Sequence, residues 1–286
     1  MDRLIVHNDR IIPLDEAHLS PGQAGLLMGW GVFTTLRLYR GQPFEFHRHW
    51  LRMTRDAARL SVPMVDAEET VEQLVVELAR ANGREEGMAR LTFIRNAGGA
   101  WAASDGWRAT DLLLFTHELA AWPRAHRLRI QPRAVFSGGV FAGAKMLSWA
   151  QNSLLLERAR ADGFDDVLLL NERGQLAECT SANVFLVRAG EVLTPPLSSG
   201  CLPGVTREIL LEMAPEAGVR LVERELTTAD LAQAQEVFIS STTREVAPVT
   251  SIAPDWHYTA PGELTLRLEA AFRRYADASL ELKARV

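Results

Sequence analysis

Two groups of strand and helix patterns, separated by one irregular stretch, indicate an α+β fold for this chain. With 286 residues the chain is longer than a typical single domain, so we expect two domains, with a single large domain as the alternative. The first group covers residues 1–119 and the second covers residues 130–286. Residues 120–129 contain Trp122-Pro123 and several arginines without a regular pattern, so we expect the linker between the domains there.

Each expected domain has its own strands and helices. Alternating apolar residues indicate strands, and apolar residues three or four positions apart indicate helices. In the first domain we expect strands at 4–12 (with a hairpin turn at Asn8-Asp9), 32–39, 89–95 and 111–116, and helices at 47–60 and 66–81. In the second we expect strands at 128–135, 166–170, 176–179, 183–187, 219–223 and 237–241, and helices at 149–161, 205–216 and 263–282.

The composition argues against several classes of protein. The net charge is −5 and there is no basic run of the kind that binds nucleic acid. No segment approaches the roughly 18 apolar residues of a membrane span, and the first residues lack the apolar core of a signal peptide, so we expect a cytoplasmic protein. Cys179 and Cys201 are too few for a disulfide framework. The seven histidines show no metal-binding spacing, so we expect no metal site.

Lys145 differs from the other basic residues in its chemistry. Among 31 lysines and arginines only Lys145 and Lys283 are lysines, and Lys145 is the only charged residue between Arg133 and Glu157. Arginine keeps its proton, whereas a lysine in apolar surroundings supplies a neutral amine that forms a Schiff base with a carbonyl group. The position therefore indicates a requirement for an amine. The alternative is a lysine retained by chance in an arginine-rich chain, with its side chain reaching the surface.

Two loops of the second domain are suited to hold an anion. Residues 200–206 lead directly into a predicted helix, whose first N–H groups attract negative charge together with the Thr206 hydroxyl. Residues 240–243 are Ser-Ser-Thr-Thr and end a predicted strand. Arg52, on a predicted helix of the first domain, supplies a positive charge. The alternative for each loop alone is an ordinary helix cap or turn, and neither loop matches a P-loop or dinucleotide motif.

Glu178 lies between apolar residues of the predicted strand 176–179. A buried carboxylate needs a partner, although strand alternation also permits this side chain to face solvent. A carboxylate can also keep a pyridine nitrogen protonated, which makes pyridoxal 5'-phosphate (PLP) an electron sink. An amine, such a carboxylate and two anion-binding loops together indicate a PLP site.

Over nearly its whole length the chain resembles the class IV aminotransferases, which are PLP enzymes of fold type IV. This family includes branched-chain aminotransferases, D-amino acid aminotransferases and aminodeoxychorismate lyases. The resemblance rests on six segments in the order of the family: 29–37, 49–53, 145–149, 177–185, 202–207 and 240–249. It implies a D-amino acid aminotransferase-like fold, with a small N-terminal α/β sandwich and a larger β-barrel-like C-terminal domain. It also implies a homodimer, with PLP between the two domains and near the dimer interface.

The same resemblance implies a role for each candidate residue. Lys145 would hold PLP covalently and then move a proton during catalysis. Glu178 would pair with the pyridine nitrogen. The phosphate ligands would be Arg52, Val205 (through its backbone N–H), Thr206, Ser241 and Thr242.

Three differences from the family pattern concern the substrate. Trp149 stands where branched-chain enzymes often have a tyrosine, and Thr34 stands where a glutamate is usual. The R-x-H motif with which D-amino acid enzymes bind a carboxylate is missing from residues 94–99, so D-amino acids are the least expected substrates.

We expect a PLP-dependent aminotransferase acting between an amino acid, of branched-chain type, and a 2-oxo acid, because residues 240–243 are typical of transaminases. One alternative is a 4-amino-4-deoxychorismate lyase, which residues 33–35 and Glu178-Cys179 favour. A remote alternative is a non-catalytic PLP-binding protein, against which the presence of both Lys145 and Glu178 argues.

Overall fold

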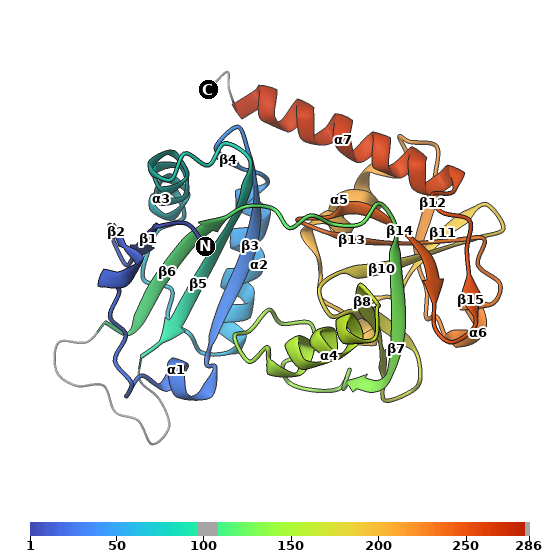
Figure 1. Cartoon of the computed structure of the whole chain (residues 1–286), viewed down its shortest axis with the longest axis horizontal. Coiled ribbons are helices and arrows are strands. Elements are labelled where there is room, and N and C mark those ends of the chain that lie inside the picture. Colours follow the sequence, from blue (N-terminus) through green and yellow to red (C-terminus); the bar gives the residue numbers. More distant parts are fainter. Residues whose placement is uncertain (97–107, 284–286) are drawn as a thin grey trace. The chain divides into compact units, whose positions relative to one another are not determined.

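The structure is a computed structural model that describes residues 1–96 and 108–283, with side chains up to residue 281. Packing divides the chain into two compact units, each with its own sheet (Figure 1). The first unit contains residues 1–120, 144–149 and 279–286, and the second contains residues 121–143 and 150–278. The expected domain ranges 1–119, 120–129 and 130–286 differ from this division at residues 144–149, which contain Lys145, and at residues 279–286, both of which belong to the first unit.

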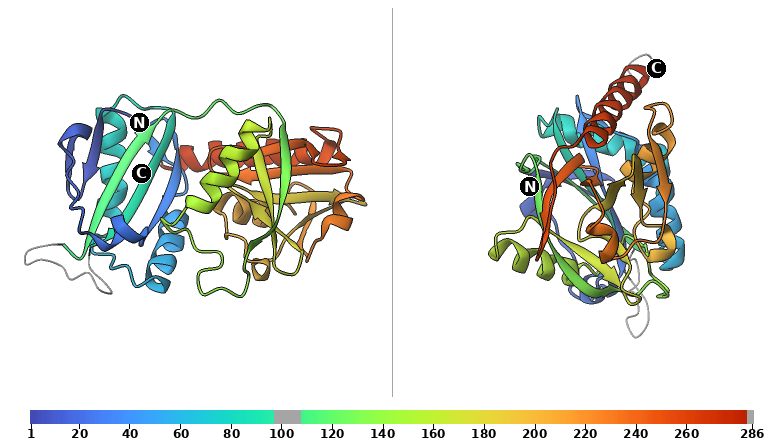
Figure 2. Two further views of the ribbon diagram at one scale, coloured as in Figure 1. Left: turned by 60° about the horizontal axis from the view of Figure 1, so that its bottom comes forward. Right: turned by 90° about the vertical axis from the view of Figure 1, so that its right-hand side faces the viewer.

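The first unit has a six-stranded antiparallel sheet in the order β2-β1-β6-β5-β3-β4. Its strands are β1 (Leu4–His7), β2 (Arg10–Pro13), β3 (Gly31–Tyr39), β4 (Gln42–Pro43), β5 (Gly87–Arg95) and β6 (Thr110–His117). Helices α2 (Phe46–Arg59) and α3 (Glu68–Ala81) cover one face of this sheet (Figures 1 and 2). The short helix α1 (Ala24–Met28) and a 3-10 helix (Leu14–Glu16) lie in the connection from β2 to β3.

The side chains of β3 alternate between the two faces of the sheet. Val32, Leu36 and Leu38 are completely buried in the core formed with α2 and α3. Successive side chains of a strand point to opposite faces. Phe33 and Arg37 therefore lie on the face that carries no helix.

Residues 144–147 extend the first unit's sheet along the free edge of β3. The backbone N–H of Phe33 donates to the carbonyl of Lys145 (3.1 Å), and the N–H of Leu147 donates to the carbonyl of Gly31 (2.9 Å). Val32 and Met146 form an antiparallel bridge between these two bonds. These backbone bonds are the physical reason why Lys145 belongs to the first unit although the chain around it belongs to the second.

The second unit has a nine-stranded mixed sheet that curls into a half-barrel (Figure 2). The strand order is β12-β11-β10-β13-β14-β7-β8-β9, and β15 pairs with β14. The strands are β7 (His126–Val135), β8 (Asp166–Asn171), β9 (Leu176–Cys179), β10 (Asn183–Arg188), β11 (Glu191–Thr194), β12 (Arg220–Glu223), β13 (Glu236–Ser241), β14 (Glu245–Ile252) and β15 (Trp256–His257). The helices that begin in this unit are α4 (Ala150–Ala161), α5 (Val205–Met213), α6 (Thr228–Leu231), α7 (Glu263–Lys283) and a 3-10 helix (Leu197–Ser199).

The α+β class expected from the sequence is confirmed, and so are most of the expected elements. Strands β4, β11, β14 and β15 and helices α1 and α6 were not expected, and β7 begins at His126, inside the expected linker. Pro248 stands within β14, and its ring removes a backbone donor, which argues against a strand when only the sequence is known. Across residues 1–96 and 108–283, no helix has a long enough apolar stretch to cross a lipid bilayer.

A buried ion pair joins three segments of the second unit. Arg244 lies in the turn between β13 and β14, and its guanidinium is 3.0 Å from the carboxylate of Asp166, with the two side chains 1% and 0% exposed. Asp166 also accepts a hydrogen bond from the hydroxyl of Ser181 (2.9 Å), and Arg244 donates to that same hydroxyl oxygen (3.0 Å). Arg244 stacks on the ring of Trp122 at 3.9 Å. The pair thus holds the β9–β10 loop and the β13–β14 turn against the start of β8.

We expect Asp166→Asn to destabilise the protein, because it leaves the Arg244 guanidinium buried without its counter-ion. Breaking a buried pair in this way costs about 3–5 kcal/mol in the free energy of unfolding. Asp162→Asn is the matched control, since the Arg129–Asp162 pair is 38% and 57% exposed and such a pair contributes about 0–1 kcal/mol. Denaturant titration of both variants checks this, and equal small losses would contradict it.

Candidate active site

The side chain of Lys145 lies between two aromatic rings of the first unit. Its Nζ atom is 4.5 Å from the ring centroid of Phe33 and 5.0 Å from that of Trp149. The backbone N–H of Lys145 donates to the carboxylate of Asp56 on α2 (3.0 Å), and Asp56 is completely buried. Because Met146 packs against the core, the neighbouring Lys145 points to the opposite, helix-free face of the sheet, where Phe33 also lies.

Arg52 is held on α2 by two polar neighbours. Its guanidinium donates to the hydroxyl oxygen of Thr34 (2.9 Å) and lies 3.4 Å from Nδ1 of His49. The Thr34 oxygen is 2.8 Å from the same His49 nitrogen. All three side chains are buried. The guanidinium only donates, so the Thr34 hydroxyl accepts from Arg52 and donates to Nδ1 of His49, which leaves the ring proton on Nε2.

His49 is neutral in this arrangement. Burial lowers the pKa of His49 well below its usual range, and the positive charges of Arg52 and Lys145 lower it further. The histidine therefore adds no third positive charge beside Lys145 and Arg52. It acts as a hydrogen-bond acceptor that fixes the Thr34 hydroxyl, which in turn fixes Arg52.

Glu178 lies on β9 in the second unit, opposite Leu169 of β8, and is half-buried. Its carboxylate accepts a hydrogen bond from the backbone N–H of Leu202 (3.0 Å). Burial raises the pKa of the nearby Cys201 thiol to about 11, and the negative charge of Glu178 adds to this shift. Glu178 therefore has a partner in the loop that leads into α5.

The start of α5 offers free backbone donors. Gly204 precedes the helix and no side chain caps it, so the first N–H groups, those of Val205 and Thr206 among them, have no partner within the helix. A Cβ atom at position 204 would collide with the side-chain oxygen of Asn183, which explains the glycine. Asn183 donates to the carbonyl of Leu202 (2.9 Å) and holds the loop in place.

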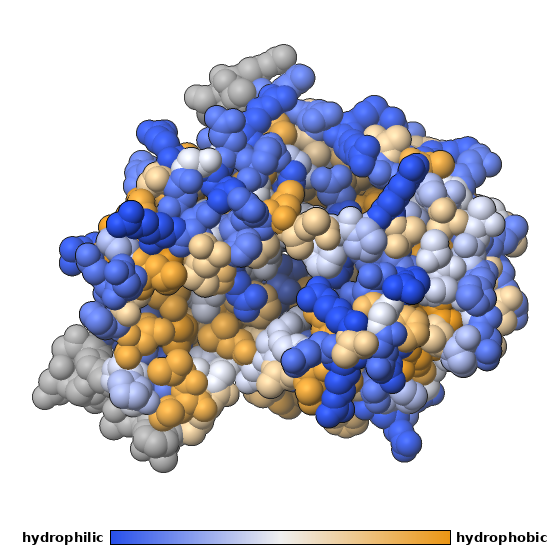
Figure 3. All heavy atoms as spheres, viewed as in Figure 1, coloured by the Kyte–Doolittle hydropathy of each residue, from blue (hydrophilic) through white to orange (hydrophobic). Residues whose placement is uncertain are grey.

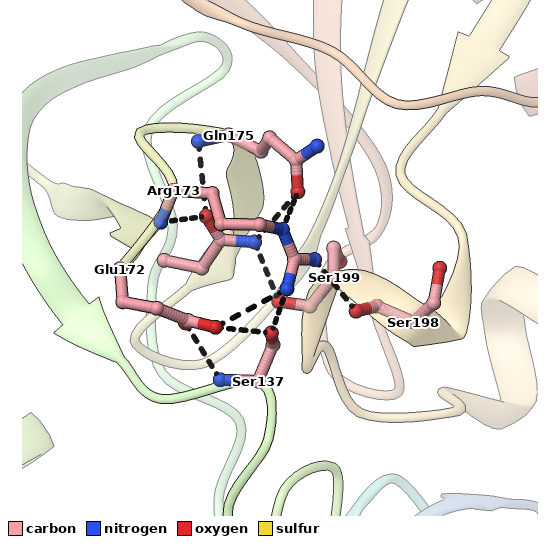
Figure 4. A network of polar contacts seen from close by, with 7 residues as sticks. Ser137, Glu172, Arg173, Gln175, Ser198 and Ser199 are labelled. Carbon is pink, nitrogen blue, oxygen red and sulfur yellow. Dashed lines mark hydrogen bonds and ion pairs between the residues drawn. The ribbon is translucent and has the colours of Figure 1, made fainter.

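Polar contacts join this loop to the one that precedes Lys145 (Figure 4). Glu172 accepts hydrogen bonds from both the N–H and the hydroxyl of Ser137 (2.8 Å each). Arg173 donates to the Ser137 oxygen (2.7 Å) and to the carbonyl of Ser198 (3.1 Å). The turn between β8 and β9 thus connects the loop after β7 with the loop before α5.

Ser241 and Thr242 lie where β13 ends and the turn to β14 begins. The hydroxyl of Ser241 accepts a hydrogen bond from the backbone N–H of Arg244 (3.2 Å), and both hydroxyl residues are half-buried. Ser240, the preceding residue, pairs with Asn183 of β10. This register places the turn beside the loop that leads into α5.

The structure brings the expected site residues together in two sets. Lys145 and Arg52 belong to the first unit, where the positive charge of each lowers the pKa of His49. The second unit holds the other set: Glu178, Val205, Thr206, Ser241 and Thr242. The sequence interpretation missed His49 and Asp56. His49 precedes Arg52 by three positions and so shares a helix face with it, a signal that was available from the spacing.

The sequence analysis also expected neither an R-x-H motif nor a metal site. Residues 97–99, part of the segment compared with the R-x-H motif, lie outside the described residues. In the part of the chain that the structure describes, no group of histidine, cysteine, aspartate and glutamate side chains is arranged to hold a metal ion.

Comparison with known proteins places the chain in a family. A family model described as amino-transferase class IV matches residues 31–252. A relative named "Putative branched-chain-amino-acid aminotransferase" from Methanocaldococcus jannaschii is 28% identical over 272 residues, which cover 93% of this chain and 94% of that protein. A D-alanine aminotransferase from Listeria innocua is 28% identical over 257 residues, which cover 87% of each chain.

Among solved structures, a branched-chain aminotransferase from Thermoproteus uzoniensis with norvaline is 26% identical. It covers 98% of this chain and 96% of its own, with a TM-score of 0.87. This likeness confirms the fold type IV architecture expected from the sequence. Because the family model matches well over half of its residues, this chain belongs to the class IV aminotransferases.

Proposed function

We propose that the protein is a PLP-dependent aminotransferase that moves an amino group between an amino acid of branched-chain type and a 2-oxo acid. The observation that carries this proposal is the position of Lys145. It is the only lysine within the matched range 31–252, and its amine lies between the rings of Phe33 and Trp149. The relatives named as branched-chain aminotransferases support the type of substrate.

The residues present fit PLP. A phosphate needs positive charge and hydrogen-bond donors, and Arg52, the free N–H groups at the start of α5 and the hydroxyls of Thr206, Ser241 and Thr242 supply both. The pyridine nitrogen needs an acceptor, and the Glu178 carboxylate supplies one. We propose that these residues bind one PLP molecule, with Val205 contributing its backbone N–H.

PLP, when bound, supplies an electron sink for the bonds at the substrate's Cα atom. The protein's own residues would bind and orient the cofactor and move protons. Lys145 would hold the cofactor covalently through its Nζ atom, and the same amine would move a proton during catalysis. Glu178 would keep the pyridine nitrogen protonated. Thr34 and the neutral His49 hold Arg52 in place, and Arg52 would bind the phosphate.

A lyase is the second candidate, because Trp149 and Thr34 depart from the branched-chain pattern. Trp149 lies 5.0 Å from Lys145 Nζ, and Thr34 hydrogen-bonds Arg52, so both departures fall next to the proposed site. A 4-amino-4-deoxychorismate lyase would use the same lysine but release pyruvate and 4-aminobenzoate without an amino acceptor. The two activities therefore differ in products rather than in cofactor residues.

We expect the holoenzyme to form glutamate from 2-oxoglutarate and L-leucine, with conversion of bound PLP to its amino form. The measurement is a coupled glutamate assay with L-leucine, D-alanine and 4-amino-4-deoxychorismate supplied separately. D-alanine belongs in the panel because a D-alanine aminotransferase is as similar as the branched-chain relative. Release of 4-aminobenzoate without glutamate from either amino acid would favour the lyase.

Variants at Lys145 and Glu178 test the proposed roles. Lys145→Ala should abolish amino transfer and the absorbance band of the lysine-bound cofactor, because no other lysine lies in the matched range.

Glu178→Gln should still bind PLP but lose about 10²–10³-fold in kcat, since a neutral amide no longer stabilises the protonated nitrogen. Full turnover of Lys145→Ala, or a rate of Glu178→Gln close to wild type, would remove the corresponding assignment.

We also propose that the protein is a homodimer. Helix α1 presents Leu26, Leu27 and Met28, each about half exposed, and Figure 3 shows apolar residues gathered around this part of the first unit. Exposed apolar patches mark surfaces that bind another protein, a membrane or a ligand, and we propose that a second copy of this chain covers this one. Light scattering should give twice the chain mass of 31.7 kDa. A mass that stays at one chain as the concentration rises would contradict the dimer.

A cytoplasmic location completes the proposal. Cys179 and Cys201 are both free and buried. Burial raises the pKa of both thiols, so neither is a reactive thiolate near neutral pH. Free thiols of this kind are usual in a reducing compartment.

A further inference from the structure

Asp56 is a carboxylate with no exposed surface on the face of α2 that packs against β3. His49, Arg52 and Met53 are also buried on this helix. Their spacing of three or four residues places all four side chains on one face. Proteins rarely bury a carboxylate without partners, because removing a charge from water is costly. The contacts of Asp56 therefore indicate its role.

Each oxygen of the Asp56 carboxylate has its own partner. Oδ1 accepts hydrogen bonds from Nη2 (2.6 Å) and Nε (3.1 Å) of Arg55, whose side chain is 45% exposed. Oδ2 accepts a hydrogen bond from the backbone N–H of Lys145 (3.0 Å), a residue 89 positions further along the chain. Arg55 thus balances the negative charge from the surface, while the second oxygen is directed at the backbone of the lysine.

The backbone bonds around Lys145 hold the peptide planes on both sides of its Cα atom. The plane before the Cα contains the N–H that donates to Asp56. The plane after it contains the carbonyl that accepts a hydrogen bond from the N–H of Phe33 (3.1 Å). Because each peptide unit is planar, fixing both planes fixes the two backbone dihedrals of Lys145 and hence the direction of its side chain. Asp56 therefore controls one of the two planes that direct the amine.

The same helix carries Arg52, the proposed phosphate ligand. Arg52 and Asp56 are four residues apart on α2, which is about one turn and about 6 Å along the helix axis. Arg52 donates to Thr34, and Asp56 holds the backbone of Lys145. One rigid element of the first unit thus sets the spacing between the proposed phosphate ligand and the backbone of the lysine.

We propose that Asp56 is a positioning residue for Lys145, an inference that rests on the proposed aminotransferase function. Its carboxylate holds the lysine backbone in the orientation that keeps the amine between the rings of Phe33 and Trp149. An ionised acceptor makes a stronger hydrogen bond than a neutral one, which explains why a carboxylate occupies this buried position. Asp56 acts through the backbone of Lys145 and not through its amine.

The lysine content of the chain gives a direct test, because Lys145 and Lys283 are its only lysines. The full chain, freed of cofactor, is incubated with pyridoxal, which lacks the phosphate group, so that phosphate contacts do not contribute. Borohydride reduces the imines, and mass spectrometry of the peptides gives the ratio of labelling at Lys145 to labelling at Lys283. In the wild type Lys145 should be labelled more than Lys283, and equal labelling of the two would overturn the proposal.

Two substitutions of Asp56 separate its hydrogen bond from its charge. Asp56→Leu removes the acceptor and fills the buried space, and should lower the labelling ratio about 10- to 100-fold, the value of a hydrogen bond to a charged group. Asp56→Asn keeps an oxygen that accepts the Lys145 N–H, so the ratio should fall only about 5-fold. An unchanged ratio in Asp56→Leu, or equal losses in both variants, would overturn the proposal. If Asp56→Leu does not fold, a wild-type ratio in Asp56→Asn overturns it.

Asp2→Ala is the matched control within the first unit. Asp2 pairs with Arg84 (2.5 Å) and accepts a hydrogen bond from the hydroxyl of Thr116 (2.7 Å), so it combines an arginine with a second donor as Asp56 does. Its loss should lower the midpoint of thermal unfolding but leave the labelling ratio at the wild-type value. A ratio that falls as far in Asp2→Ala as in Asp56→Leu would show a general loss of stability and contradict the assignment.

Turnover separates this inference from the proposed function. In the holoenzyme, Asp56→Asn should lower kcat with L-leucine while KM stays near that of wild type, because Lys145 acts in the chemical step. A loss confined to KM would contradict the positioning role. If the labelling ratio depends on Asp56 while no amino acid is transaminated, the aminotransferase proposal fails and the positioning role stands.

Discussion

The attachment of residues 144–147 to the edge of β3 is the interaction on which the candidate site depends. Two backbone hydrogen bonds hold this short segment in an extended conformation, so its side chains alternate between the faces of the sheet. Met146 enters the core and Lys145 faces the rings. Gly31 makes this possible, because a Cβ atom there would collide with the carbonyl of Phe93 and the side chain of Leu147. Backbone geometry therefore directs the Lys145 side chain to the helix-free face, where its amine lies between the rings of Phe33 and Trp149.

The charged side chains near the proposed site are held in place by different kinds of contact. Arg52 is fixed by the Thr34 hydroxyl, and a histidine kept neutral by burial completes that arrangement without adding charge. Glu178 is oriented by the backbone N–H of Leu202. Arg90 is supported by a ring instead of an anion. Arg52 and Glu178 thus each have a polar partner within their own unit.

The sequence predicted those parts of the structure that depend on local pattern. The helices and strands of the first unit, such as α2 and β5, have strong periodicity and were expected close to their observed ends. The position of Lys145 in the first unit was not, because the pairing of residues 144–147 with β3 depends on chain segments far apart in sequence. Likewise, Thr34 stood out as a departure from the family, but its bond to Arg52 follows from the register of β3 against α2. The binding roles of Glu178, Thr206 and Thr242 rest on chemistry and resemblance and stay proposals.

The membership of residues 144–149 in the first unit has a consequence for how the chain is divided. A fragment cut at the boundary near residue 120 would contain β3 but not the segment that pairs with its edge. The exposed N–H and C=O groups of such an edge are a template for pairing with other chains, so the fragment would be prone to aggregate. The two units are thus interlaced along the sequence, and neither could be exchanged between relatives as one continuous piece without losing the residue that defines the site.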